Sequence, residues 1–238
     1  MTGTDTGVGK TVVAAAICAA LAARSERVAA FKPAVTGLDE QQGAWPYDHV
    51  LLASVASSGQ SPEDVAPYRF GPPVSPHHAA ELAGTQIDFT RLHALASAAA
   101  AGADALVCEG VGGLMVPLTD RHLVRDLAAG LGLPIVIVAR PGVGTISHTL
   151  LTIEAARAAH LRPAGVVMTP WPARPSPGEL SNRRSVELLG GCPVVGLNRC
   201  EVRDLAEAGN SLPLANWLGE QGDDSARTVI RRSASDEG

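Results

Sequence analysis

The segment "GTDTGVGKT", residues 3–11, combines three glycines with a terminal Lys-Thr pair. Glycines let backbone N–H groups converge on an anion, and the N-terminus of a following helix adds positive potential. In a loop of this kind the lysine contacts the β- and γ-phosphates of a nucleotide, and the threonine hydroxyl is a ligand for Mg²⁺. The segment therefore predicts a phosphate-binding loop (P-loop) in which Lys10 and Thr11 begin a helix.

The spacing of this loop departs by one residue from the common pattern G-x-x-x-x-G-K-[ST]. Counted back from Lys10, the first glycine position holds Thr4, whereas Gly3 comes one residue early. A chance Gly-Lys-Thr ahead of an ordinary helix is the alternative interpretation. The flanking glycines and the apolar helix behind them favour a nucleotide site.

Only Met1 and Thr2 precede Gly3, although a P-loop ordinarily follows a buried strand at the centre of a parallel sheet. Two hypotheses account for this. The favoured one is that the natural protein carries several more apolar residues ahead of Met1. The other is that the chain lacks its central strand, in which case it would bind nucleotide weakly or not at all.

Two other polar segments follow predicted strands. Lys32 and Thr36 come after the strand expected over residues 27–33, and Glu109 ends the strand expected over residues 104–110. Because ligands collect at the carboxyl ends of parallel strands, we expect both segments to converge on the P-loop. The alternative is that each is a solvated surface group.

Glu109 is the more informative of these residues. It follows an apolar run, where a carboxylate is costly unless it is paired or bound to a metal ion. Gly110, Gly112 and Gly113 would let the backbone approach a ligand closely. We therefore expect Glu109 to bind a metal ion.

Short β-branched runs alternate with longer Ala- and Leu-rich stretches, which is typical of a parallel sheet covered by helices. The pattern predicts an α/β protein with the three-layer P-loop NTPase fold, in which the first strand is truncated or missing. Helices are expected over residues 10–24, 47–56, 88–102, 124–132, 145–160 and 182–191, and further strands over 134–139, 164–168 and 192–197. Residues 37–78 are otherwise expected to be irregular. The expected domain spans residues 1–218 and is followed by a polar, disordered tail over 219–238.

The composition of the 238-residue chain favours small-molecule partners. Net charge is −5 and the basic residues are scattered, which argues against nucleic acid or an anionic membrane surface. No apolar run reaches the roughly 20 residues that span a bilayer, and no signal peptide is evident. The four cysteines lack a C-x-x-C spacing, so reduced thiols and a cytoplasmic location are expected.

Five motifs together resemble one family. "GTDTGVGKT", "KPAVTG", "PPVSPH", "EGVGG" and "GTISHTLLT", in this order, look like the dethiobiotin synthetases of biotin biosynthesis, and the resemblance runs from Thr2 to about Leu197. It implies an ATP-dependent ligase that closes a cyclic urea. An amine of 7,8-diaminopelargonate captures CO₂ as a carbamate, the γ-phosphoryl of ATP is transferred to it, and the second amine displaces phosphate. The resemblance also implies Mg²⁺ and a homodimer.

The same resemblance implies roles for individual positions. Catalysis would depend on Lys10, Lys32 and Thr6, with Lys32 bridging the carbamate and the γ-phosphate. The nucleotide would contact Thr6, Gly7, Val8, Gly9, Lys10, Thr11, Glu109 and Thr169. Mg²⁺ would be held by Thr11, Asp48 and Glu109. The diamine and carbamate would contact Thr6, Lys32, Thr36, Gly112, Gly113, Thr145 and Ser147, of which the last two come from the second subunit.

Four residues, at three places in the chain, depart from the family pattern. Gly7 stands where some members carry an acidic residue, and Ser147 replaces a frequent Asn. Thr169 and Pro170 replace an Asn-Asp pair that reads adenine in many members, and proline has no backbone N–H to donate. ATP is therefore the default nucleotide, with other triphosphates left open.

A nucleotide-switch ATPase of the partitioning kind is the rival class of function. Such proteins usually carry a second lysine early in the P-loop and often a basic amphipathic C-terminal helix. Residues 3–9 contain no lysine, and the C-terminal sequence has mixed charge. His77 and His78 have no third ligand at a suitable spacing, so we interpret them as helix-start or substrate-loop residues rather than a metal site.

Overall fold

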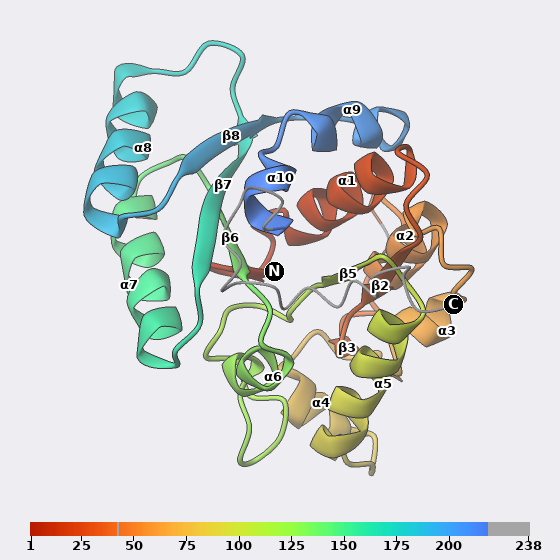
Figure 1. Cartoon of the computed structure of the whole chain (residues 1–238). Helices are drawn as coiled ribbons and strands as arrows, with labels where there is room; N and C mark the ends of the chain where they lie inside the picture. The colour runs from red at the N-terminus through yellow and green to blue at the C-terminus, as the bar shows by residue number, and fades with distance from the viewer. Residues whose placement is uncertain (42, 219–238) are drawn as a thin grey trace, which may run out of the picture.

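The computed structural model describes residues 1–41 and 43–218, and within them helices cover both faces of a parallel sheet (Figure 1). This three-layer arrangement confirms the predicted α/β P-loop fold. The tail predicted over residues 219–238 lies outside the described residues.

The sheet consists of parallel strands whose carboxyl ends share one edge. One part has the order β1-β6-β7-β8, and the other pairs β2 with β5. The strands are β1 (Thr2–Gly3), β2 (Val28–Phe31), β5 (Ala105–Cys108), β6 (Ile135–Ala139), β7 (Pro163–Trp171) and β8 (Val194–Asn198). A separate small parallel pair joins β3 (Ala34–Val35) to β4 (Tyr68–Arg69).

The first strand, β1, lies between the two parts of the sheet. On one side Thr2 pairs with Ile137 of β6. On the other side the Met1 amine donates to the carbonyl oxygen of Cys108 at 2.5 Å, and the Gly110 N–H donates to the Met1 carbonyl at 2.9 Å. The order across the molecule is therefore β2-β5-β1-β6-β7-β8. The P-loop follows β1, where the strand order switches from one side of the sheet to the other, which is the usual ligand position in such sheets.

Two groups of helices cover the sheet. The first face carries α1 (Lys10–Ala22), α2 (Asp48–Val55), α9 (Leu205–Asn210) and α10 (Leu214–Leu218). The opposite face carries α4 (Pro76–Leu82), α5 (Phe89–Ala101), α6 (Val124–Leu131), α7 (Thr145–Ala158) and α8 (Pro177–Gly190). A short helix α3 (Pro62–Val65) lies beside α2, and a 3₁₀ turn η1 (Val202–Asp204) precedes α9.

Successive side chains of each strand point to opposite faces of the sheet and fill the core on both sides. Ala105 and Val107 of β5 pack toward α1, whereas Leu106 and Cys108 pack toward α5 and α6. This double burial explains why the strands are continuous apolar runs rather than alternating ones. Helix α1 is rich in alanine, so its neighbours can approach its backbone closely.

The predicted helices and main strands are confirmed within a few residues, with corrections at specific places. Helix α5 is capped by Asp88 as expected, since its carboxylate accepts the N–H of Arg91 at 3.0 Å. Helix α8 begins five residues before the predicted start, because Ser176 and Glu179 form a capping box. The expectation that 37–78 is irregular outside one helix is wrong for α3, β4 and the first turn of α4.

Helix α9 crosses α1 at Gly209. A Cβ atom at position 209 would lie 2.0 Å from the Ala16 carbonyl oxygen. We expect Gly209→Ala to destabilise the protein by about 1–3 kcal/mol, since backbone must move to relieve the overlap. Thermal unfolding should show a midpoint lower by several degrees. Gly142→Ala is the matched control, because its added Cβ meets nothing within 4 Å; equal midpoints for both variants would contradict the packing described.

Candidate active site

The P-loop lies between β1 and the first turn of α1. Gly7 and Gly9 have φ angles of 68° and 98°, which favour glycine and turn the loop back over the helix. Gly9 caps α1 without a side-chain hydrogen bond, and the first turn contains no acidic residue. The helix therefore presents free N–H groups, as an anion-binding N-terminus does.

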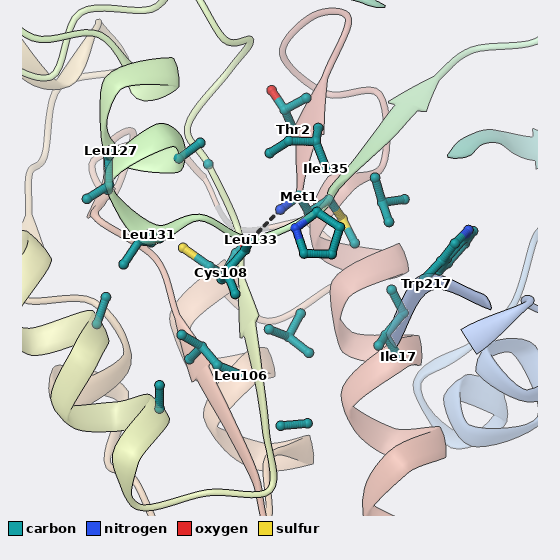
Figure 2. Close-up of a pocket in the computed structure, with 18 of the residues that line it drawn as sticks. Met1, Thr2, Ile17, Leu106, Cys108, Leu127, Leu131, Leu133, Ile135 and Trp217 are labelled. Atoms are coloured by element: carbon teal, nitrogen blue, oxygen red, sulfur yellow. Dashed lines mark hydrogen bonds between the residues drawn. The ribbon is translucent and has the colours of Figure 1, made fainter. Parts of the chain in front are cut away.

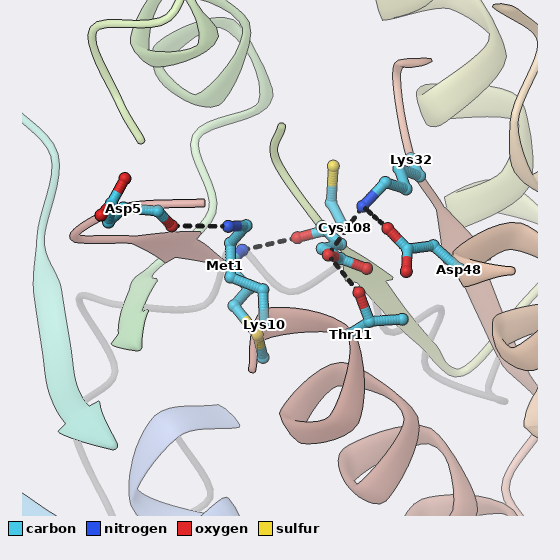
Figure 3. Close-up of polar contacts among 8 residues, drawn as sticks. Met1, Asp5, Lys10, Thr11, Lys32, Asp48 and Cys108 are labelled. Carbon is cyan, nitrogen blue, oxygen red and sulfur yellow. Dashed lines mark hydrogen bonds and ion pairs between the residues drawn. The ribbon is translucent and has the colours of Figure 1, made fainter. Parts of the chain in front are cut away.

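Lys10 is buried at the first position of α1. Its Nζ donates to the Asp5 carbonyl oxygen at 3.0 Å, so the side chain folds back over the loop (Figure 3). Burial lowers the pKa of Lys10, and the nearby Glu109 carboxylate opposes that shift in part. The Asp5 carboxylate in turn accepts the N–H of Thr6 at 2.7 Å and braces the turn.

A cluster of opposite charges lies beside the loop (Figure 3). The ammonium of Lys32 is 2.7 Å from Oε1 of Glu109 and 2.7 Å from Oδ2 of Asp48. The Thr11 hydroxyl donates to Glu109 Oε1 at 2.9 Å. Four separate segments thus meet around one carboxylate, as expected for groups at the carboxyl edge of a parallel sheet.

The pKa shifts in this cluster follow from burial and from the shared lysine. Burial alone would lower the pKa of Lys32, but Glu109 and Asp48 outweigh it and raise the pKa above its ordinary value. Burial would raise the pKa of Asp48, whereas the Lys32 ammonium lowers it overall. The pKa of Glu109 is raised, because complete burial outweighs a cation that it shares with Asp48. Glu109 therefore lacks part of the positive charge that would balance it.

The residues present fit a hard divalent cation. Glu109 Oε2 is buried and has no hydrogen-bond partner among the described residues. The Asp48 side chain is 40% exposed to solvent. Together with the Thr11 hydroxyl they form an all-oxygen donor set, which suits Mg²⁺ when phosphates and water complete the shell. Within residues 1–41 and 43–218, no group of three or more His, Cys, Asp or Glu side chains forms a metal site by itself.

The glycine-rich segment after β5 lies against the P-loop. Gly113 forms a parallel bridge with Gly3, and a Cβ on Gly113 would lie 3.1 Å from the Gly3 carbonyl oxygen. A Cβ on Gly112 would lie 3.6 Å from the Thr6 hydroxyl. The predicted substrate residues Thr6, Gly112 and Gly113 are therefore neighbours. Val8 at the centre of the loop is buried and anchors it in the core.

Other predicted residues are less directly connected. Thr36 follows β3, is half-buried and makes no described contact with the P-loop. The Thr145 hydroxyl lies inside α7, 3.4 Å from the Thr149 hydroxyl, whereas Ser147 is exposed on the outer face of that helix. Thr169 is buried with its methyl group against the loop, since a Cβ on Gly9 would lie 2.8 Å from it.

Sequence reasoning missed Arg140. Its guanidinium donates to the carbonyl oxygens of Thr6 and Gly7 at 3.3 and 3.4 Å and so braces the P-loop from the end of β6. Its position directly after a buried strand was an available signal, of the same kind that identified Lys32 and Glu109.

The His77–His78 pair starts a helix, as one of the two interpretations expected. Both rings lie in the first turn of α4 and contact the Glu81 carboxylate, at 3.4 and 2.9 Å.

Lysine occurs at two positions in the entire chain, Lys10 and Lys32. Both lie in this site, and both are buried. Everywhere else the chain uses arginine where it needs a long cationic side chain. A compact ammonium with rotatable donors suits a centre in which the partner oxygens change during a reaction.

The fold and the loop place the chain among the P-loop nucleotide-binding proteins. Residues 1–197 match the family described as "AAA domain". The chain is 44% identical to the ATP-dependent dethiobiotin synthetase BioD of Anaeromyxobacter dehalogenans strain 2CP-1, over 71% of this chain and 74% of that protein. It is 33% identical to the protein of the same name from Bacillus subtilis strain 168, over 83% and 84%. The chain belongs to the dethiobiotin synthetase family.

A prediction follows from the unequal burial of the Lys32 partners. We expect Lys32→Met to lower the free energy of unfolding by about 3 kcal/mol, because it leaves Glu109 buried without its cation. Adding Glu109→Gln should recover a large part of that loss, since the remaining side chain carries no charge. Urea unfolding of the two single variants and the double variant measures the coupling. Simple additivity of the two single effects would show that the ion pair is energetically unimportant.

Proposed function

We propose that the protein is an ATP-dependent dethiobiotin synthetase that acts on 7,8-diaminopelargonate and CO₂. The main support is the convergence of Lys10, Thr11, Lys32 and Glu109 on one edge of the sheet, in a chain of this family. In the proposed reaction one amine adds to CO₂ to form a carbamate. A carbamate oxygen takes the γ-phosphoryl of ATP, and the second amine then forms the ring C–N bond while the C–O bond to phosphate breaks.

The P-loop would hold the triphosphate. Lys10 would exchange the Asp5 carbonyl for the β- and γ-phosphate oxygens, and the loop and helix N–H groups would contact the same oxygens. These hydrogen bonds would become stronger as negative charge develops on the phosphate oxygens in the transition state. Phosphoryl transfer needs no covalent enzyme intermediate, so its catalysis depends mainly on this electrostatic stabilisation and on positioning. Arg140 would keep the loop in position without touching the substrate.

Thr11, Asp48 and Glu109 would hold Mg²⁺, which supplies positive charge to the phosphate oxygens when bound. The Lys32 ammonium lies 2.7 Å from each carboxylate, so Glu109 and Asp48 share its single positive charge. In the proposed reaction Lys32 would bridge the carbamate and the γ-phosphate with its rotatable ammonium donors.

The diamine would lie over the segment formed by Thr6, Gly112 and Gly113. Their adjacency supports this position, because the Thr6 hydroxyl faces the backbone of Gly112 across an open edge of the loop. Thr36 stays a prediction for the same site. Backbone N–H groups and one hydroxyl would orient the amine and donate to the carbamate oxygens, whose negative charge Lys32 would balance.

For the nucleotide base, Thr169 would act mainly by shaping the P-loop. Its methyl group fills the space beside Gly9, and it is buried. A threonine in this position provides one hydroxyl, whereas an amide side chain provides both a donor and an acceptor. ATP is the proposed co-substrate, and base discrimination would be weaker than with an amide side chain at this position.

We further propose a homodimer built on the outer face of α7 and α8. These helices pack side by side at one end of the sheet (Figure 1). Their outer surface exposes Leu151, Leu188 and Leu189 at 65%, 77% and 65%, a concentration of apolar side chains that supports a protein contact. Ser147 lies one turn before Leu151 on the same exposed face, so it would reach the partner's site rather than its own.

The cytoplasm is the proposed location. All four cysteines are free thiols, which fits a reducing compartment. No helix in the described part of the chain combines the length and the apolar character needed to cross a membrane.

The proposed activity predicts that phosphate release requires the diamine. Purified protein with ATP, Mg²⁺ and bicarbonate should release phosphate and form dethiobiotin when 7,8-diaminopelargonate is added. Diamine-independent hydrolysis would instead favour the nucleotide-switch class, and absence of nucleotide binding would favour an impaired binding module. In Lys32→Ala we expect turnover to fall by at least about a thousandfold, while binding of a non-hydrolysable ATP analogue changes by less than about threefold. Retained turnover in this variant would remove Lys32 from the mechanism.

The proposed dimer predicts the effect of a charge on α7. Leu151→Asp should convert a dimer into a monomer, because a carboxylate at the centre of an apolar contact is not compensated. Light scattering measures the mass, and ATP-analogue binding should persist because the P-loop belongs to one chain. Leu82→Asp on α4, where the leucine is 58% exposed, is the control and should leave the mass unchanged. A monomeric wild type, or a dimeric Leu151→Asp, contradicts the proposal.

A further inference from the structure

Strand β6 brings Arg140 to the P-loop. The strand begins in the interior, where Ile135 borders a largely apolar cavity of about 220 Å³ (Figure 2). Near its carboxyl end the Val138 carbonyl accepts the N–H of Thr4 at 2.9 Å, so β6 runs beside the chain that enters the P-loop. Arg140 follows two residues later, outside the core, and its side chain is exposed next to the loop.

Arg140 sets the direction of two peptide groups in the P-loop. Its guanidinium donates to the carbonyl oxygens of Thr6 and Gly7, at 3.3 and 3.4 Å. In a trans peptide the C=O of one residue and the N–H of the next point in opposite directions. The N–H groups of Gly7 and Val8 therefore point away from the guanidinium, and neither has a hydrogen-bond acceptor among the described residues. Both are available to bind a phosphate oxygen.

The backbone at Gly7 needs such a restraint. Gly7 is exposed, its φ angle is 68°, and without a Cβ atom the peptide groups on either side can reorient at small cost. Arg140 forms no ion pair within the described part of the chain that would hold it over these peptides. The position of its guanidinium therefore depends on the backbone that carries it.

That backbone belongs to the loop 140–144, which connects β6 to α7. Its residues 142–144 are exposed, so the loop has little apolar contact of its own. Asn182 of α8 reaches it instead: Nδ2 donates to the Pro141 carbonyl at 3.0 Å and to the Gly142 carbonyl at 3.3 Å. Because both partners are acceptors, only the amide nitrogen of this side chain can face them.

Helix α8 is a firm support for this contact. Arg183, the residue after Asn182, donates through Nε to the Val194 carbonyl of β8 at 3.0 Å. One turn further on, Val186 is buried in the core on this side of the sheet. Asn182 therefore connects the loop 140–144 to a helix that is packed on the sheet.

We propose that Asn182 is a positioning residue for nucleotide binding and that it acts through Arg140. Its amide fixes two loop carbonyls, which fixes the place from which the Arg140 side chain extends. Arg140 then holds the N–H groups of Gly7 and Val8 toward the phosphates. Asn182 itself contacts only loop backbone. The inference rests on the proposed ATP site at the P-loop and extends that site to a helix of the outer layer.

Asn182→Asp tests the first link. The variant keeps the shape of the side chain but turns the donating amide into a carboxylate that faces two carbonyl oxygens. We expect binding of a non-hydrolysable ATP analogue with Mg²⁺, measured by calorimetry, to weaken about fivefold. Asn210→Asp on α9 is the matched control, because there the side-chain oxygen accepts from Arg24 at 3.1 Å and a carboxylate still accepts. The control should bind the analogue within about twofold of the wild type.

A double-variant cycle shows whether the effect passes through Arg140. Arg140→Met removes the donors and should weaken analogue binding about tenfold. In that background Asn182→Asp should change the affinity by less than about twofold, because the connection through which it acts is already lost. Two independent effects would multiply instead. In turnover assays Asn182→Asp should raise the KM for ATP and leave kcat within about twofold, since the residue does not touch the reacting atoms.

Two results would overturn the proposal: wild-type analogue affinity in a folded Asn182→Asp, or multiplying effects in the cycle. If Asn182→Asp does not fold, Asn182→Ser removes the same hydrogen bonds without adding a charge, and wild-type affinity in that variant would contradict the proposal equally. The binding measurements need neither the diamine nor CO₂, so their failure would leave the proposed reaction to its own assay. A wild-type protein that does not bind the analogue would contradict the proposed function itself.

Discussion

The contact between Lys32 and Glu109 is the interaction on which the rest of this site depends. A carboxylate without any exposed surface is strongly unfavourable unless positive charge lies beside it, and here that charge is 2.7 Å away. The pair forces the end of β2 and the end of β5 to stay together, and Thr11 adds the start of α1 through the same carboxylate oxygen. The arrangement that balances this buried charge in the absence of ligands is thus also the one that the proposed reaction would use.

The sheet supplies the geometry that makes this contact reachable. Parallel strands end at one edge, so residues 10, 32 and 109 become neighbours although long segments separate them in the chain. The P-loop lies at the switch between strands that continue on either side of β1. Helix α1 packs against the sheet on one side and against α9 on the other, and this packing holds the P-loop that precedes it in place. The residues of the candidate site are therefore carried by packed strands and helices.

Much of this arrangement could be predicted, because the signals were local. A glycine loop with Lys10, a strand-ending Glu109 and the apolar runs between them are visible in short windows of sequence. The strands β3 and β4 could not be found in this way, because each has two residues and its partner lies more than thirty positions away. The bracing of the loop by Arg140 likewise depends on tertiary placement. The sequence around Gly209 also gives no sign of its packing role, because that role depends on the Ala16 carbonyl of a distant helix.

The confinement of lysine to positions 10 and 32 has a practical consequence for spectroscopy. Isotope enrichment of this one amino acid would place every labelled side chain inside the candidate site and none on the outer surface. The resulting spectrum would contain two ammonium environments, one resting on a loop carbonyl and one held between two carboxylates. Changes in each of the two lysine signals on addition of nucleotide or cation would show which ligand reaches the site first. The experiment needs no substitution in the protein.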